Sequence, residues 1–195
     1  MSRGRRLSRS FYARDPLAVA PDLLNKVLVH GDRAGRIVEV EAYRGADDPA
    51  SHAFRGETAR TRVMFGPAGH LYVYFSYGMH WCANAVTSAD GEAGAVLIRA
   101  LAPLRGIAEM EASRPAARRR VDLANGPAKA CQAMGIDGTF DGADLTTRDR
   151  GVAIVDDGVP PPPQPATGPR VGISVATDLP WRFSVPGDPH RSKPW

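Results

Sequence analysis

Short runs of apolar and β-branched residues recur along the chain, and their alternation with polar residues predicts strands rather than long helices. Such runs lie at 27–30, 36–43, 71–76, 80–86 and 94–101. Short strands are also expected at 152–155, 170–175 and 181–185. Turns rather than helices separate most neighbouring runs, which is typical of an antiparallel sheet. Residues 77–79 form the expected tip of a hairpin between the runs 71–76 and 80–86.

Helices are expected at 16–26, 105–112 and 125–135. The last has clear boundaries, because Asn125 can cap its start, Pro127 stands in the first turn and Gly135 can end it. The predicted fold class is α+β. We expect a single mixed domain with a curved, mostly antiparallel sheet, a protruding β-hairpin and surrounding helices.

Charge divides the chain unevenly. The net charge of the 195 residues is +4, yet residues 1–14 hold five arginines and no acid. The other residues hold 20 basic and 21 acidic side chains, which excludes a uniformly basic, histone-like protein. Residues 1–10 are therefore expected to form a disordered basic arm, and residues 11–195 the folded domain. The positive part of that domain is its middle, since residues 55–120 carry a net charge of +4.

Several functional classes lose support. No apolar run approaches 18 residues, and no apolar segment follows the first arginines, so neither a membrane span nor a secretory signal is expected. Cys82 and Cys131 make no disulfide framework, which favours a reducing cytoplasm. Zinc-hydrolase, dinucleotide and phosphate-loop motifs are missing, and the five histidines lack ligand spacing. No metal and no cofactor are expected.

The predicted strand 36–43 carries two carboxylates. Glu39, Glu41 and Tyr43 alternate on one of its faces, and the pattern alone favours a face turned to water. A carboxylate beside an aromatic ring can also act as a general base, which contributes about 10²–10⁴-fold to a rate. Pattern alone leaves both interpretations open.

The predicted hairpin is rich in tyrosine. For Tyr72 and Tyr74, a place in the core is as good an explanation as a functional role. Tyr77 stands at the turn, where burial in a core is harder to achieve. Arginines of the segment 55–62 precede the hairpin. Cationic groups beside aromatic surfaces suit nucleic acid, and Tyr77 is a candidate wedge between stacked bases. Only three of the 25 basic residues are lysines, which weakens a Schiff-base mechanism; coding bias explains the arginine excess as well as phosphate binding does.

These blocks, in this order, resemble the alkyladenine (3-methyladenine) DNA glycosylase family, from residue 11 onward. They are RIVEVEAYRGADDPASH (36–52), RTRVMFGPAGHLYVYFSYGMHWCANAV (60–86), VLIRALAP (96–103), NGPAKACQAMGI (125–136), RVGI (170–173) and PWRF (180–183). The end of the chain, 187–195, and the proline-rich run 160–165 depart from the family. Neither departure is expected to touch the motif residues.

The resemblance implies roles for individual residues. Glu41 would activate a water against the anomeric carbon, Arg99 would help to hold that water, and the Val171 carbonyl would supply its third contact. Glu39 matches no catalytic role. In the substrate pocket, the flipped base would stack on Tyr43, His52 and Tyr74. The backbone around Ala50 and His52 would form hydrogen bonds with its edge. Asn84 would disfavour guanine by opposing its amino group. The DNA contacts would be the Tyr77 wedge, Met64, Met79, Thr58 and Arg60.

The function implied is a monofunctional DNA glycosylase of base excision repair. It would flip out 3-methyladenine, 7-methylguanine, hypoxanthine or ethenoadenine and hydrolyse the N-glycosidic bond, leaving an abasic site. Its partner would be double-stranded DNA containing damaged purines; we expect a monomer in the cytoplasm, at the bacterial nucleoid, without membrane contact. Two alternatives stay open: a non-catalytic damage-binding module, which would not need Glu41, and a hydrolase of free nucleosides, which would not need Tyr77.

Overall fold

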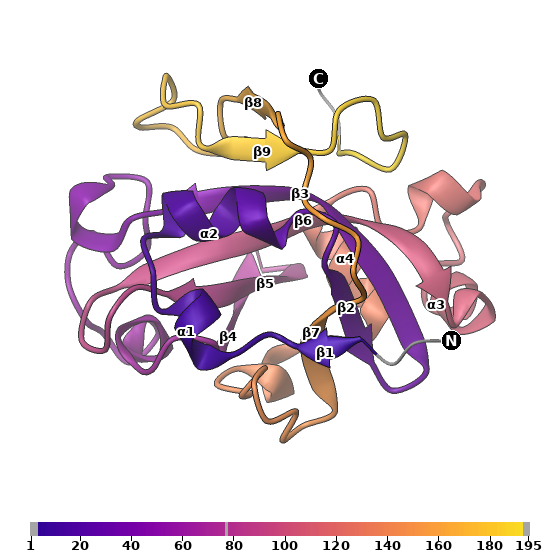
Figure 1. The fold of residues 1–195 in the computed structure, drawn as a ribbon, viewed down its shortest axis with the longest axis horizontal. Coiled ribbons are helices and arrows are strands. Elements are labelled where there is room, and N and C mark those ends of the chain that lie inside the picture. The colour runs from indigo at the N-terminus through magenta and orange to yellow at the C-terminus, as the bar shows by residue number, and fades with distance from the viewer. Residues whose placement is uncertain (1–3, 77, 193–195) are drawn as a thin grey trace.

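The computed structural model describes residues 4–76 and 78–192, and the nine strands of this part pair antiparallel in one curled sheet (Figure 1). The strands are β1 (Arg5–Arg6), β2 (Val27–His30), β3 (Arg33–Tyr43), β4 (Leu71–Ser76), β5 (His80–Thr87), β6 (Gly94–Arg105), β7 (Val152–Asp156), β8 (Ala166–Gly168) and β9 (Arg182–Ser184). Their order along the main path is β1-β7-β2-β3-β6-β5-β4, and β9 pairs with both β3 and β8.

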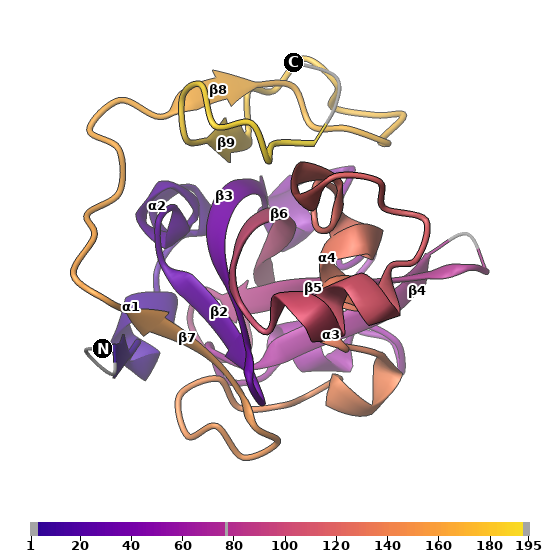
Figure 2. The same cartoon turned by 90° about the vertical axis from the view of Figure 1, so that its right-hand side faces the viewer.

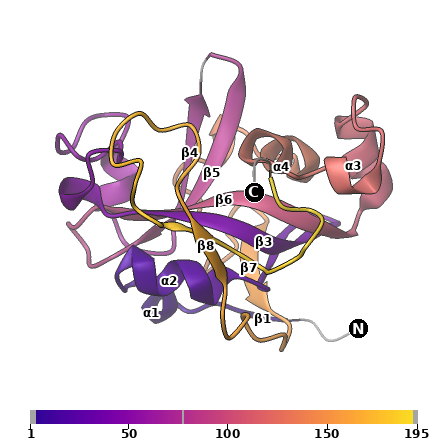
Figure 3. The same cartoon turned by 90° about the horizontal axis from the view of Figure 1, so that it is seen from above.

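The two longest strands, β3 and β6, form the centre of the sheet. Their register places Glu41 opposite Leu97 and Tyr43 opposite Ala95. The β4–β5 hairpin projects from the rest of the molecule, as Figures 2 and 3 both show. The predicted class, a single α+β domain with a curved antiparallel sheet and a protruding hairpin, is confirmed.

Short helices cover the sheet. They are α1 (Arg9–Tyr12), α2 (Pro16–Leu23), α3 (Ile107–Ser113) and α4 (Pro127–Met134), with 3-10 turns η1 (Gly45–Asp47), η2 (Arg62–Phe65), η3 (Arg120–Asp122) and η4 (Gly138–Phe140). α2 packs on β3, and α4 packs on β5 and β6. Large side chains buried between these layers include Leu23, Leu28, Ile37, Ile98 and Met134. In the described ranges no helix is long and apolar enough to cross a membrane.

The helix expected at 125–135 forms, with one correction at its start. Pro127 begins it and Gly135 ends it in the left-handed region at φ 67°, as predicted. Asn125 does not cap it: Gly126 is the N-cap, and the Asn125 side-chain oxygen instead accepts a hydrogen bond from Lys129 Nζ at 2.7 Å.

The strand expected at 170–175 does not form. The strand of this region lies earlier, at β8, and pairs with β9. Pro169 ends β8 because it has no N–H to donate. Arg170 then turns its side chain inward, where it is buried, and Gly172 takes a positive φ of 79°. The segment 170–175 is therefore a loop that brings residues to the site rather than a strand.

The expected disorder of the first ten residues is wrong for residues 5–10. β1 pairs with β7, and Leu7 is buried with 7% of its surface exposed. Arg9 donates to the Ala68 carbonyl and forms an ion pair with Asp144, both at 2.6 Å. A buried leucine and an ion-paired arginine attach this segment to the domain, despite its basic composition.

Candidate active site

A β-bulge positions the two carboxylates of β3. The register between β3 and β6 shifts on both sides of Glu39, and Glu39 and Glu41 are both fully buried. The exposure favoured by the alternating pattern is therefore wrong. Arg99, on β6 and 5% exposed, lies between them: its Nη1 is 3.2 Å from Glu41 Oε1 and its Nε is 3.1 Å from Glu39 Oε1. The shared guanidinium compensates two carboxylates that the core would otherwise exclude.

Besides the ion pair with Arg99, Glu41 receives two hydrogen bonds. The Val171 N–H donates to Oε1 at 2.7 Å, and the Tyr43 hydroxyl donates to Oε2 at 2.9 Å. Together with the Arg99 ion pair, these contacts from β3, β6 and the 170–175 loop hold the carboxylate in place. Val171 thus meets Glu41 through its N–H; its carbonyl, expected to contact the water, stays a prediction.

Burial raises the pKa of Glu41, while Arg99, the Val171 N–H and the Tyr43 hydroxyl lower it, and the net direction is upward. Burial, followed by the negative charge of Glu41, also raises the pKa of Tyr43. Tyr43 therefore keeps its proton and acts as a donor. The arrangement gives a carboxylate that gains a proton more readily than an exposed glutamate does, as a general base must.

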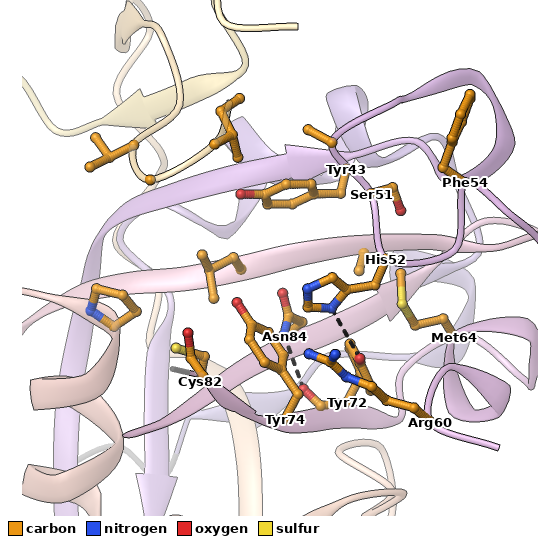
Figure 4. A pocket seen from close by; sticks show the side chains of 18 of the residues that line it. Tyr43, Ser51, His52, Phe54, Arg60, Met64, Tyr72, Tyr74, Cys82 and Asn84 are labelled. Atoms are coloured by element: carbon orange, nitrogen blue, oxygen red, sulfur yellow. Dashed lines mark hydrogen bonds between the residues drawn. The ribbon is translucent and has the colours of Figure 1, made fainter. Parts of the chain in front are cut away.

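A pocket of about 640 Å³ is lined by Tyr43, Arg99 and Val171, the three residues that contact this carboxylate. Figure 4 shows Tyr43 on one side of it and His52 and Tyr74 on the other. The volume lies in the range of about 300–1,000 Å³ typical of small-molecule sites. The structure brings the predicted residues Tyr43, Ala50, His52, Met64, Tyr74, Asn84, Arg99 and Val171 to this pocket, along with Arg60.

The wall opposite Tyr43 is a set of mutually packed rings. The His52 and Tyr74 rings are perpendicular with centroids 4.5 Å apart, and Tyr72 stacks on Tyr74 at 5.6 Å. Tyr72 also hydrogen-bonds its hydroxyl to His52 Nδ1 at 3.1 Å (Figure 4). Partial burial and the charge of Arg60 lower the pKa of His52 to about 4, so the ring is neutral near pH 7. Tyr72, which sequence reasoning left open as a core residue, orients His52.

Two polar groups expected to contact the base already have protein partners. The Asn84 amide donates to the Tyr72 carbonyl at 3.1 Å, and Asn84 is 4% exposed (Figure 4). The Ala50 N–H donates to Asp48 Oδ1 at 3.1 Å. These bonds hold the pocket edge in place, and they engage the Ala50 N–H within the protein.

Sequence reasoning missed a buried ion pair behind the pocket. Arg170 donates to both carboxylate oxygens of Asp48 and to the Ala42 carbonyl. Its guanidinium lies over the Tyr43 ring at 4.6 Å and over the Trp181 ring at 5.0 Å. The ion pair joins the loop that carries Val171 to the loop that carries Ala50. The Arg170 guanidinium also packs against the Tyr43 ring. Asp48 and Arg170 lie inside the quoted family blocks, but nothing in the sequence says that they meet.

The expected DNA contacts divide into three groups. Thr58 and Arg60 lie on an exposed loop, with Arg60 over the Tyr74 ring at 5.4 Å, and Met79 is 68% exposed at the hairpin turn. Met64 differs from expectation: it is 2% exposed and lines the pocket, because its 3-10 turn packs it against the sheet. Tyr77 lies outside the described residues.

The segment after β9 also differs from expectation. Although it departs from the family pattern, it does touch the motif residues: Ser192 donates to Glu39 from both its N–H and its hydroxyl, and Arg99 Nη2 donates to the Ser192 hydroxyl. Separately, the described part of the chain holds no group of three or more His, Cys, Asp or Glu residues that could bind a metal ion.

The profile of the methylpurine-DNA glycosylase family matches residues 10–189. The chain belongs to this family. A relative from Burkholderia lata, named as a candidate 3-methyladenine DNA glycosylase, is 59% identical over 189 residues, covering 96% of this chain and 91% of the relative. A protein of the same name from Streptomyces avermitilis is 47% identical over 189 residues, covering 94% of this chain and 89% of the relative. Another from Methanoculleus marisnigri is 48% identical over 194 residues, covering 96% of this chain and 98% of the relative.

As a methylpurine-DNA glycosylase, the protein is a DNA-repair hydrolase of N-glycosidic bonds. This agrees with a pocket of aromatic walls beside a buried carboxylate, and it disfavours the two alternatives of a binding module and a nucleoside hydrolase.

Proposed function

We propose that this glycosylase takes a damaged purine, flipped out of duplex DNA, into the pocket between Tyr43 and the His52–Tyr74 wall and hydrolyses its N-glycosidic bond. The observation that carries the proposal is that Arg99, Tyr43 and Val171, the three residues that contact the buried Glu41 carboxylate, all line the pocket. The enzyme would be monofunctional and would leave an abasic site.

The chemistry needs one water and one carboxylate. The water oxygen attacks the anomeric carbon of the flipped nucleotide while one of its protons passes to Glu41. The bond between that carbon and the purine nitrogen breaks, and its electron pair leaves with the base; a base that was neutral in the DNA, such as hypoxanthine, also takes up a proton from water. Arg99 would help to hold the water, and the Val171 carbonyl would supply its third contact.

The substrates proposed are 3-methyladenine, 7-methylguanine, hypoxanthine and ethenoadenine. The two methylated bases carry a positive charge, so they leave as neutral molecules, and a cation is attracted to aromatic faces. A neutral His52 supports this, because a protonated ring on the wall would repel a cationic base. Asn84 is held by its hydrogen bond to the Tyr72 carbonyl. We expect it to disfavour binding of undamaged guanine by opposing the amino group of that base.

Entry of the base requires extrusion from the duplex, at a cost of a few kcal/mol that is lower for damaged or mispaired bases. Stacking on aromatic walls returns about 1–3 kcal/mol per base. Tyr77 would fill the gap left in the duplex, and Thr58, Arg60 and Met79 would contact the DNA around it. One pocket and one wedge suit a monomer acting on one lesion, and the site of action would be the bacterial nucleoid.

A panel of duplexes, each with one of the four lesions, tests the proposal. Incubation followed by alkali should cut the strand at the lesion, and the free base should appear in the supernatant. Binding without base release would favour the non-catalytic module instead. No lysine is among the described residues that line the pocket, so borohydride should trap no enzyme–DNA adduct; a trapped adduct would contradict the monofunctional mechanism.

A further inference from the structure

Glu39 is a fully buried carboxylate with no part in the proposed chemistry. It accepts hydrogen bonds from Arg99 Nε at 3.1 Å, from the Ser192 N–H at 2.5 Å and from the Ser192 hydroxyl at 2.8 Å. Arg182 Nη1 lies 3.6 Å from it. A buried charge with this many donors is unlike a residue that merely fills a core.

Ser192 joins the same cluster from outside the sheet. It is 3% exposed, and its hydroxyl accepts from Arg99 Nη2 at 3.1 Å while donating to Glu39. A serine hydroxyl donates one hydrogen bond and accepts up to two, so both contacts can exist together. The segment after β9 thereby reaches two charged groups on the central strands.

The three guanidinium nitrogens of Arg99 have three different partners. Nε bonds to Glu39, Nη2 to Ser192, and Nη1 lies against Glu41. Because the guanidinium is planar and rigid, holding Nε and Nη2 fixes the direction of Nη1. If the two outer contacts were lost, Arg99 could rotate away from Glu41.

We propose that Ser192 and Glu39 are positioning residues for the glycosylase reaction, which together hold Arg99 in the orientation that orders Glu41. The proposal rests on the proposed role of Glu41. It also gives a function to a residue beyond the part of the chain that the family profile matches, which ends at residue 189.

Ser184 offers a matched control. It lies on β9 directly opposite Glu39 and is fully buried, as Ser192 nearly is. Within the described residues its hydroxyl has no hydrogen-bond partner. Ser184→Ala therefore removes a buried hydroxyl from the same neighbourhood without removing a bond to Glu39 or Arg99.

The experiment measures single-turnover base release at saturating enzyme, and affinity for the lesion duplex, in the full-length protein. Ser192→Ala should slow release about tenfold with affinity unchanged, since displacement of a catalytic group costs up to about 10²-fold. Ser192→Thr, which keeps the hydroxyl, should restore most of the rate, and Ser184→Ala should match the wild type. In a Glu39→Gln background, Ser192→Ala should slow release less than it does in the wild type, because coupled residues are not additive.

Release by Ser192→Ala within twofold of the wild type would overturn the proposal. So would equal losses in Ser192→Ala and Ser184→Ala, failure of Ser192→Thr to restore the rate, or additive effects with Glu39→Gln. Circular dichroism melting confirms that each variant is folded at the assay temperature. If the wild type released no base, or if Glu41→Gln matched it, the proposed function would fail; a slow Glu41→Gln beside a fast Ser192→Ala would reject the positioning role alone.

Discussion

The buried ion pair between Arg170 and Asp48 is expected to hold one side of the pocket together, and the stability of an Asp48→Asn variant tests this. Asp48→Asn keeps the side-chain shape and removes the charge, which leaves the Arg170 guanidinium buried without a counter-ion. Both side chains are fully buried, and removing one partner of such a pair costs about 3–5 kcal/mol. That is a large share of the roughly 5–15 kcal/mol by which domains are stable. At about 2–4 °C per kcal/mol for a chain of this size, the melting temperature should fall by about 10 °C.

The matched control is the surface pair Arg36–Asp157. It has the same bidentate geometry, with bonds at 3.2 and 2.7 Å, but its side chains are 20% and 28% exposed. Asp157→Asn should therefore cost about 1 kcal/mol or less. Thermal and urea unfolding followed by circular dichroism measure both variants. If Asp48→Asn destabilised the protein no more than Asp157→Asn, the Arg170–Asp48 pair would not be what holds the Tyr43 and Val171 side of the pocket.

Three further predictions concern ionisation and the first residues of the chain. Burial raises the pKa of Glu41, and the base must be ionised, so single-turnover release should rise with pH through a midpoint above the ordinary value of 4.5; a midpoint at or below 4.5 would contradict this. His52, with a pKa of about 4, should titrate in NMR well below 6.5. His52 gains its proton at a higher pH in the unfolded chain than in the folded protein, so the free energy of unfolding should fall as pH drops from 6.5 towards 4. Arg60→Gln should raise the pKa of His52, because it removes a nearby positive charge. Leu7→Ala should cost about 2 kcal/mol in unfolding free energy, whereas a disordered arm would show no loss.

The sequence predicted local features well, because strand alternation and helix boundaries are local properties. The strands 27–30 and 71–76 appear with those bounds, and Gly135 ends its helix in the left-handed region as expected. The resemblance also named most of the residues that meet at the pocket. Glu41, Arg99 and Val171 come from three separate segments, and their meeting follows from tertiary structure that alternation alone does not encode.

The failures have physical causes of the same kind. The alternating pattern favoured solvent exposure for Glu39 and Glu41, because a pattern within one strand cannot show that Arg99 on another strand compensates both charges. Basic composition suggested disorder for residues 5–10, although one buried leucine and strand pairing with β7 outweigh it. Ser192 carried no signal at all, since its importance lies in contacts with residues more than 90 positions away.

The central claim is that Glu41 activates the water that releases the base. The most direct measurement is the single-turnover rate of hypoxanthine release by Glu41→Gln, at enzyme concentrations that saturate the duplex. The glutamine keeps the size of the side chain but cannot take the proton, so release should fall at least about 10²-fold while affinity for the lesion duplex stays within a few-fold of the wild type. Release by Glu41→Gln at a rate close to that of the wild type would contradict the account.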